Sequence, residues 1–122
     1  MTKSNEVEKS WLACAIDGEG SLGIRSTGLK RNQYSRFMVA NTDYKFIKKV
    51  SKLTEGKITT QRQSKGHLGK KTVYWVTINK HKDVLDILKQ ILPYLIIKKK
   101  KAKRIITFIN NRSWNKPRGT LT

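Results

Sequence analysis

The chain has 122 residues, with 27 lysines and arginines against 8 aspartates and glutamates, which gives a formal net charge of +19. This length suits a single domain, and a hydrophobic content of 37% is too high for a disordered chain. One cysteine, Cys14, excludes an internal disulfide and a cysteine-based zinc site. The sequence has no apolar run long enough to cross a bilayer and no signal peptide, so we expect a protein of a reducing compartment that is not secreted.

The positive charge indicates a polyanionic partner. Self-repulsion of this size opposes a compact fold, and counterion release from nucleic acid is the usual reason that it is tolerated. The basic residues are spread along the whole chain, and the sequence contains no basic amphipathic helix with a broad apolar face and no lipidation motif. We therefore expect nucleic acid, not a membrane, as the partner.

Hydrophobic periodicity predicts eight elements in the order α-β-β-α-β-β-α-α, at 5–16, 21–25, 34–40, 44–53, 57–63, 72–79, 81–92 and 97–110. We expect Gly18 and Gly20 to end the first helix, Gly56 to end the second and Pro93 to break the third. Two hairpins followed by helical segments predict an α+β domain over residues 1–112, with the helices on one face of a sheet. Residues 113–122 are expected to form an irregular basic tail.

The other face of the predicted sheet is expected to be polar. Strand alternation places on it Arg25, Arg36, Thr59, Gln61 and Tyr74. Long polar side chains on an open sheet are better explained by contact with a nucleic-acid groove than by solubility.

One segment is more specific than these patterns. Residues 12–20, Leu-Ala-Cys-Ala-Ile-Asp-Gly-Glu-Gly, resemble the signature of the LAGLIDADG homing endonucleases, with Cys14, Ala15, Gly18 and Glu19 replacing Gly, Leu, Ala and Asp. The resemblance extends from about residue 8 to residue 112. It implies an αββαββα core with a four-stranded, saddle-like antiparallel sheet.

The resemblance also implies an activity. Such proteins are intron-encoded, site-specific DNA endonucleases that make a double-strand break in a long pseudo-palindromic target and leave short 3′ overhangs. We therefore expect double-stranded DNA as the partner, and the cytoplasm of a prokaryote or an organelle matrix as the location. Residues 93–102 are similar to the segment that carries the family's catalytic lysine, which would be Lys98. Asn41 and Lys45 fall at further positions that the resemblance implies lie near the scissile phosphate.

The motif helix also predicts a dimer. Small residues let two helix backbones approach closely, and we expect only one copy of the motif in 122 residues, so the second helix would come from another copy of the chain. The expected contact residues are Leu12, Ala13, Cys14, Ile16 and Asp17.

A metal ion would stabilise the acidic end of that helix. Carboxylates are unfavourable at a helix C-terminus, and two copies would bring two Glu19 side chains together. The Glu19 carboxylate and a backbone carbonyl at Gly18 suit Mg²⁺, with Mn²⁺ or Ca²⁺ as non-native substitutes and no small-molecule cofactor. For Asp17 the sequence leaves two roles open, indirect metal ligation and a cap or hydrogen-bond role at the helix end in the dimer.

Further DNA contacts are expected from Ser21, Tyr34, Lys100, Arg112 and Lys116. A non-cleaving intron-splicing maturase or a DNA-binding repressor on the same scaffold is the alternative function. The retained Glu19 favours a nuclease, whereas a ribosomal protein would explain the charge but not the motif.

Overall fold

The structure, a computed structural model, describes residues 1–26, 33–61 and 72–111. Its elements are α1 (Glu6–Glu19), β1 (Gly20–Ser26), β2 (Gln33–Asn41), α2 (Tyr44–Thr54), β3 (Ile58–Gln61), β4 (Val73–Ile78), α3 (His81–Ile91), the 3₁₀ turn η1 (Leu92–Tyr94) and α4 (Lys99–Asn110). The predicted α+β class and element order are confirmed. The last two residues of the predicted strand 57–63 and the predicted tail at 113–122 lie outside the described residues.

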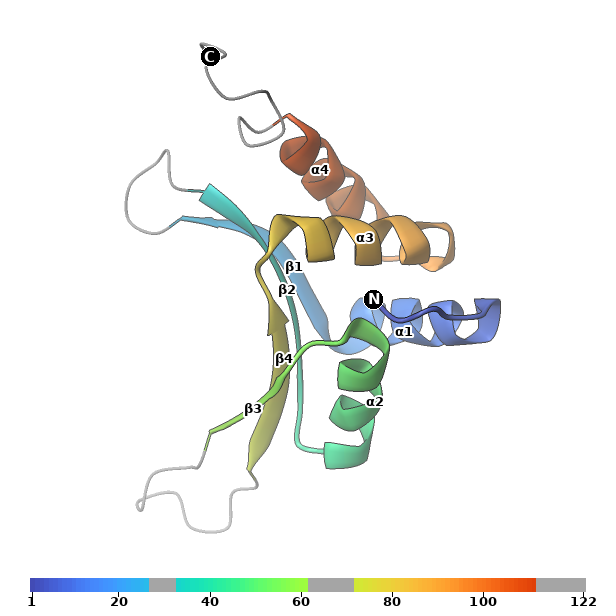
Figure 1. Cartoon of the computed structure of the whole chain (residues 1–122), viewed down its shortest axis with the longest axis vertical. Helices are drawn as coiled ribbons and strands as arrows, with labels where there is room; N and C mark the ends of the chain where they lie inside the picture. The colour runs from blue at the N-terminus through green and yellow to red at the C-terminus, as the bar shows by residue number, and fades with distance from the viewer. Residues whose placement is uncertain (27–32, 62–71, 112–122) are drawn as a thin grey trace.

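The strands form one antiparallel sheet in the order β1-β2-β4-β3, and all four helices cover the same face of it (Figure 1). The register pairs Leu22 with Phe37 and Val39 with Val76, and all four side chains are buried against the helices. Between them and the helices lies a single core built mainly from Leu, Ile and Val. Figure 1 shows the opposite face uncovered and curved inward, as the predicted saddle requires.

Helix α1 begins with a capping box and runs further than predicted. The Asn5 side chain accepts a hydrogen bond from the Glu8 amide at 2.8 Å, and the Glu8 carboxylate accepts one from the Asn5 amide at 3.1 Å. The prediction that Gly18 helps to end the helix is wrong, because the helix continues to Glu19. Gly20 alone ends it, with extended backbone and its amide bonded to the Ile16 carbonyl. A Cβ at Gly20 would lie 2.8 Å from that carbonyl, so the site requires glycine.

Helix α2 starts where Asp43 accepts a hydrogen bond from the Phe46 amide, close to the predicted start of the helix at residue 44. Its end differs from the prediction, because Glu55, not Gly56, adopts the left-handed conformation at φ 64°. Gly56 has a different function. A Cβ there would lie 2.5 Å from Cγ1 of Val76, so glycine lets the chain pass close over β4.

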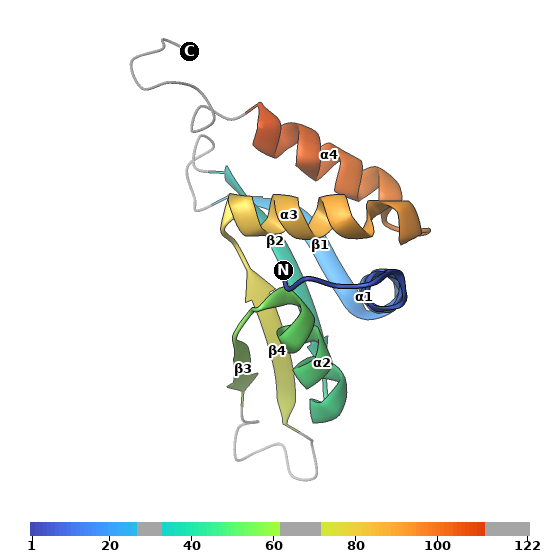
Figure 2. The same ribbon diagram turned by 45° about the vertical axis from the view of Figure 1, so that its right-hand side comes forward.

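Helix α3 gives way at Ile91 to the turn η1, which contains Pro93. The following link carries two exposed apolar side chains, Ile96 and Ile97, before α4 starts at Lys99. Figure 2 shows α1 and α4 on the side of the molecule where β1 forms the edge of the sheet. No helix within residues 1–26, 33–61 and 72–111 is long and apolar enough to cross a membrane.

Candidate active site and nucleic-acid interface

The C-terminal end of α1 is bound to the link that precedes α4. Asp17 accepts hydrogen bonds through its two carboxylate oxygens, one from the Ile96 amide at 2.7 Å and one from the Lys98 amide at 2.9 Å. In return, Nζ of Lys98 donates to the backbone carbonyl of Asp17 at 2.9 Å. These contacts join segments about 80 residues apart and fix the Lys98 ammonium beside the last turn of α1.

The same contacts explain the ionisation of Asp17. Burial by itself would raise its pKa, but the backbone amides of Ile96, Lys98 and Ile97 and the positive charge of Lys98 outweigh that effect and hold the pKa below its usual value. Both carboxylate oxygens thus accept hydrogen bonds from their own chain. Of the roles that the sequence left open for Asp17, the structure supports hydrogen bonding, and the bonds go to amides of the link before α4 rather than to the end of α1 itself.

Glu19 is placed quite differently from Asp17. It is the last residue of α1, its side chain is exposed, and among the described residues it makes no hydrogen bond or ion pair. No basic residue lies in the last turn of α1 to balance it. The Gly18 carbonyl is a further acceptor at this helix end, because helix geometry leaves it without an intrahelical partner. The neighbouring carbonyls of Ile16 and Asp17 are already bonded, to the Gly20 amide and the Lys98 ammonium.

Asn41 and Lys45 lie at the same end of the sheet as Glu19. Gly20 pairs with Val39, so Asn41, two residues further along β2, lies at the end of the ladder where α1 enters. The Asn41 side chain accepts a hydrogen bond from the Asp43 amide at 2.8 Å, which helps to start α2. Lys45 is exposed in the first turn of α2. No hydrogen bond in the described part of the chain links either residue to Glu19, so their catalytic roles stay predictions.

The open face of the sheet is basic and polar. Its register positions include Arg25, Arg36, Thr59 and Gln61, as the sequence predicts, and also Ser21 and Tyr34. None of the eight acidic residues of the chain occupies this face, and all eight lie within the described residues. Lys100 is exposed on α4, whereas Arg112 and Lys116 fall outside the described residues.

The prediction that Tyr74 lies on the open face is wrong. Tyr74 pairs with Asn41 and shares the helix-covered face with Val76, where its ring packs against Tyr44 at a centroid distance of 5.2 Å. The neighbouring Trp75, which the sequence reading missed, takes the open-face position instead.

The exposed surface of α1 corrects part of the predicted dimer contact. Leu12, Ala13 and Ile16 are wholly buried in the core of their own chain, so they are not available to a partner's side chains. Cys14 is exposed, as a contact residue must be. It belongs to an outer stripe of α1 whose members follow one another at helical spacing: Val7, Ser10, Trp11, Cys14 and Gly18. A hollow of about 250 Å³ lies on this stripe between α1 and Phe46 of α2, and Glu19 borders it.

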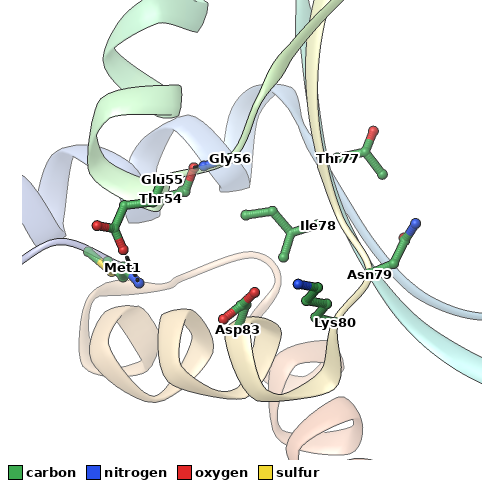
Figure 3. Close-up of a pocket in the computed structure, with 9 residues that line it drawn as sticks. All are labelled: Met1, Thr54, Glu55, Gly56, Thr77, Ile78, Asn79, Lys80 and Asp83. Atoms are coloured by element: carbon green, nitrogen blue, oxygen red, sulfur yellow. Dashed lines mark hydrogen bonds and ion pairs between the residues drawn. The ribbon is translucent and has the colours of Figure 1, made fainter.

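Acidic residues gather instead on the helix side, around a separate pocket of about 440 Å³ (Figure 3). Glu55 and Asp83 line it, and the amino group of Met1 lies 3.5 Å from Glu55 and 3.1 Å from Asp86. None of the candidate site residues borders this pocket. Basic residues thus occur on both faces of the molecule, whereas the described carboxylates lie only on the helices and at their ends.

Solved structures share this architecture. Homing endonuclease I-CvuI in complex with its target is 18% identical, with a TM-score of 0.67 over 85% of this chain and 66% of that chain. Archaeal intron-encoded I-Vdi141I complexed with DNA is 11% identical, with a TM-score of 0.68 over 88% of this chain and 69% of that one. Group I intron-encoded I-CeuI complexed with DNA is 18% identical, with a TM-score of 0.61 over 95% and 61%.

The fold is that of homing endonucleases. The predicted resemblance is therefore confirmed at the level of the fold, although this chain spans only about two thirds of the length of those enzymes. No family model matches the sequence, and no curated protein matches it.

Proposed function

We propose that this chain is a homodimeric, metal-dependent, site-specific DNA endonuclease of the intron-encoded homing type. One observation carries the proposal above the others. The unpartnered Glu19 carboxylate stands at the exposed end of α1, and the Lys98 ammonium is fixed on the Asp17 carbonyl two residues away. An exposed acid that can hold a metal ion and a positioned cation at one helix end are groups that can promote hydrolysis of a phosphodiester.

The donors at the end of α1 suit Mg²⁺. Hard divalent cations prefer carboxylate, carbonyl and water oxygens, which Glu19 and the Gly18 carbonyl supply in part. The described residues contain no group of three or more His, Cys, Asp or Glu side chains able to hold a metal, so the remaining ligands would come from DNA phosphates, water and a second copy of the chain. A bound metal would activate water and offset the charge that develops on the phosphate.

The protein's own groups have separate roles in this scheme. Glu19 places a negative charge where the cation must sit, and Asp17 holds the turn that presents Lys98. The Lys98 ammonium then stabilises negative charge on the phosphate in the transition state. Asn41 and Lys45, at the same end of the sheet, would orient solvent and the DNA strand.

The outer stripe of α1 supports the dimer. Val7 is 77% exposed, and a Cβ on Gly18 would have no neighbour within 4 Å, so a second helix could approach the backbone there. Ile96 and Ile97, at 85% and 74% exposed, extend the apolar surface next to the end of α1. A two-fold contact through these residues would bring two Glu19 side chains together, one for each strand of a duplex.

The open face supports sequence recognition. Arg25, Arg36 and Thr59 project from a curved, acid-free sheet, and paired strands of this kind can enter a major groove. Two sheets related by a two-fold axis would read the two halves of a pseudo-palindromic target. The double-strand break with short 3′ overhangs is part of the proposal.

The test starts from a target obtained by selection. A library of randomised duplexes is bound to the full chain in Ca²⁺, and the enriched sequence is then incubated with the protein in Mg²⁺ or in EDTA. We expect Mg²⁺-dependent cleavage at one position on each strand. Glu19→Gln should bind the duplex but lose cleavage, because the amide is neutral and a poor ligand for Mg²⁺.

Glu6→Gln is the matched control. Glu6 is an exposed glutamate in the first turn of the same helix, at the end remote from Lys98, and its substitution should leave cleavage intact. Specific binding by the wild type without cleavage in any divalent metal would refute the nuclease and favour a maturase or repressor.

A further inference from the structure

A groove runs along the β1 edge of the sheet, and neither Glu19 nor Lys98 lines it. Residues 21–25 of β1 form one wall, and Lys101, Arg104 and Ile105 of α4 form the other. Its volume is about 370 Å³. Because β1 is an edge strand, alternate backbone amides point out of the sheet on this side and are available as hydrogen-bond donors.

The position of the two cations in the groove follows from how α4 packs. Ala102, Ile105 and Ile109 are buried and fix the rotation of the helix against the rest of the chain. Lys101 and Arg104, three residues apart, then share the face that borders β1, while their side chains stay exposed to solvent. Across the groove stands Arg25.

No carboxylate balances these three charges. The groove has no acidic lining residue, and the hydrogen bonds and ion pairs of Asp17, Asp43, Glu55 and Asp86 go elsewhere. Among the described residues, none of the three cations forms an ion pair. Three like charges around one groove repel one another unless an anion lies between them.

The groove is continuous with the open face. Arg25 occupies an open-face register position of β1 and also lines the groove, so a DNA strand leaving the open face at this edge would pass between β1 and α4. Its phosphates would meet the Lys101 and Arg104 side chains and the edge amides. A bidentate guanidinium and a flexible ammonium are the two side-chain groups best suited to that anion.

We propose that Lys101 and Arg104, together with Arg25, form a clamp for the sugar–phosphate backbone of DNA at the β1 edge. This inference rests on the DNA binding in the proposed function, but not on cleavage. Contacts to phosphate carry no sequence information, so the clamp contributes affinity and salt dependence and leaves the choice of bases to the open face.

The experiment compares two doubly substituted proteins whose net charge is reduced by the same amount. Lys101→Ala with Arg104→Ala removes the clamp, and Lys82→Ala with Lys89→Ala removes two exposed lysines of α3. Binding to the selected target and to a duplex of unrelated sequence is measured in EDTA, where no cleavage occurs, between about 50 and 200 mM salt. Thermal unfolding of each protein confirms that the exposed substitutions leave the fold intact.

We expect the clamp variant to bind both duplexes more weakly, by a similar factor. The slope of log affinity against log salt should become shallower by about 0.9 for each phosphate that the protein no longer neutralises. The α3 variant should keep a slope close to that of the wild type. Equal slopes in the two variants would overturn the clamp, and so would weaker binding confined to the selected target. Absence of cleavage in the wild type, with the expected difference in salt slopes, would refute only the proposed nuclease.

Discussion

Substitution of Asp17 by alanine tests the link between α1 and Lys98. It removes two hydrogen bonds from backbone amides to a charged acceptor, at 2.7 and 2.9 Å. Such bonds contribute at least about 1.5 kcal/mol each. Water can replace the acceptor at the exposed Ile96 amide, so we expect a total loss of about 2 kcal/mol. For a chain of this size that corresponds to a fall in the unfolding midpoint of roughly 6–8 °C.

The assay is thermal unfolding followed by circular dichroism near neutral pH, with no DNA present. Asp83→Ala is the control, because Asp83 is exposed in the first turn of α3 and should change stability by no more than about 0.5 kcal/mol. If Asp17→Ala unfolds at the same temperature as that control, the bonds to Ile96 and Lys98 do not stabilise the fold, and this reasoning is refuted.

Three further predictions address the same end of α1. Folding lowers the pKa of Asp17, so its contribution to the free energy of unfolding is complete above the unfolded pKa and is lost as the pH falls below about 4. The free energies of unfolding of the wild type and Asp17→Asn should therefore converge at acid pH, and parallel curves would contradict the assignment. Gly20→Ala should lower the free energy of unfolding by about 1–3 kcal/mol, because its Cβ meets the Ile16 backbone, whereas the Cβ of Gly18→Ala meets no atom of its own chain and should change stability little. Similar losses in both variants, measured by denaturant unfolding, would show that the close approach at Gly20 does not determine stability. Cys14→Arg on the outer stripe of α1 should leave unfolding of the single chain unchanged and convert the proposed dimer to a monomer in sedimentation velocity. A dimer that persists in this variant would place the interface elsewhere.

Most of the fold was predictable because its local signals are strong. The stripe Phe46, Ile47, Val50 and Leu53 follows helical spacing, and Asp43 provides the cap that starts α2. Residues 34–40 alternate clearly, which placed Arg36 correctly on the open face, and Phe37 and Val39 on the opposite face are buried. Pro93 cannot continue a helix, and α3 ends two residues before it.

The errors lie where the chain is apolar on both sides. In β4, residues 73–76 are Val-Tyr-Trp-Val, a run without alternation, and only the tertiary pairing of Val76 with Val39 sends Tyr74 to the helices. Helix α1 likewise has Leu12 and Ile16 on one side and Val7 and Cys14 on another, so its sequence does not show which side faces the core.

The contacts of Asp17 were also beyond a sequence reading. The motif indicated an acidic helix end, but the partners of this carboxylate are amides of residues 96 and 98, which no local pattern connects to it. The groove between β1 and α4 could not be predicted from the sequence either, because Arg25 and Lys101 line one groove only when α4 packs beside the sheet edge.

The most direct test of the central claim is a double-mutant cycle of single-turnover cleavage rates, measured in Mg²⁺ on the selected target. It compares the wild type, Glu19→Gln, Lys98→Met and the double substitution, each shown to bind the target. If the Glu19 carboxylate and the Lys98 ammonium act on the same phosphate, each single substitution should slow cleavage strongly, and the double substitution should be little worse than either alone. Wild-type cleavage rates in Glu19→Gln, or effects that simply multiply, would contradict a shared site at the end of α1.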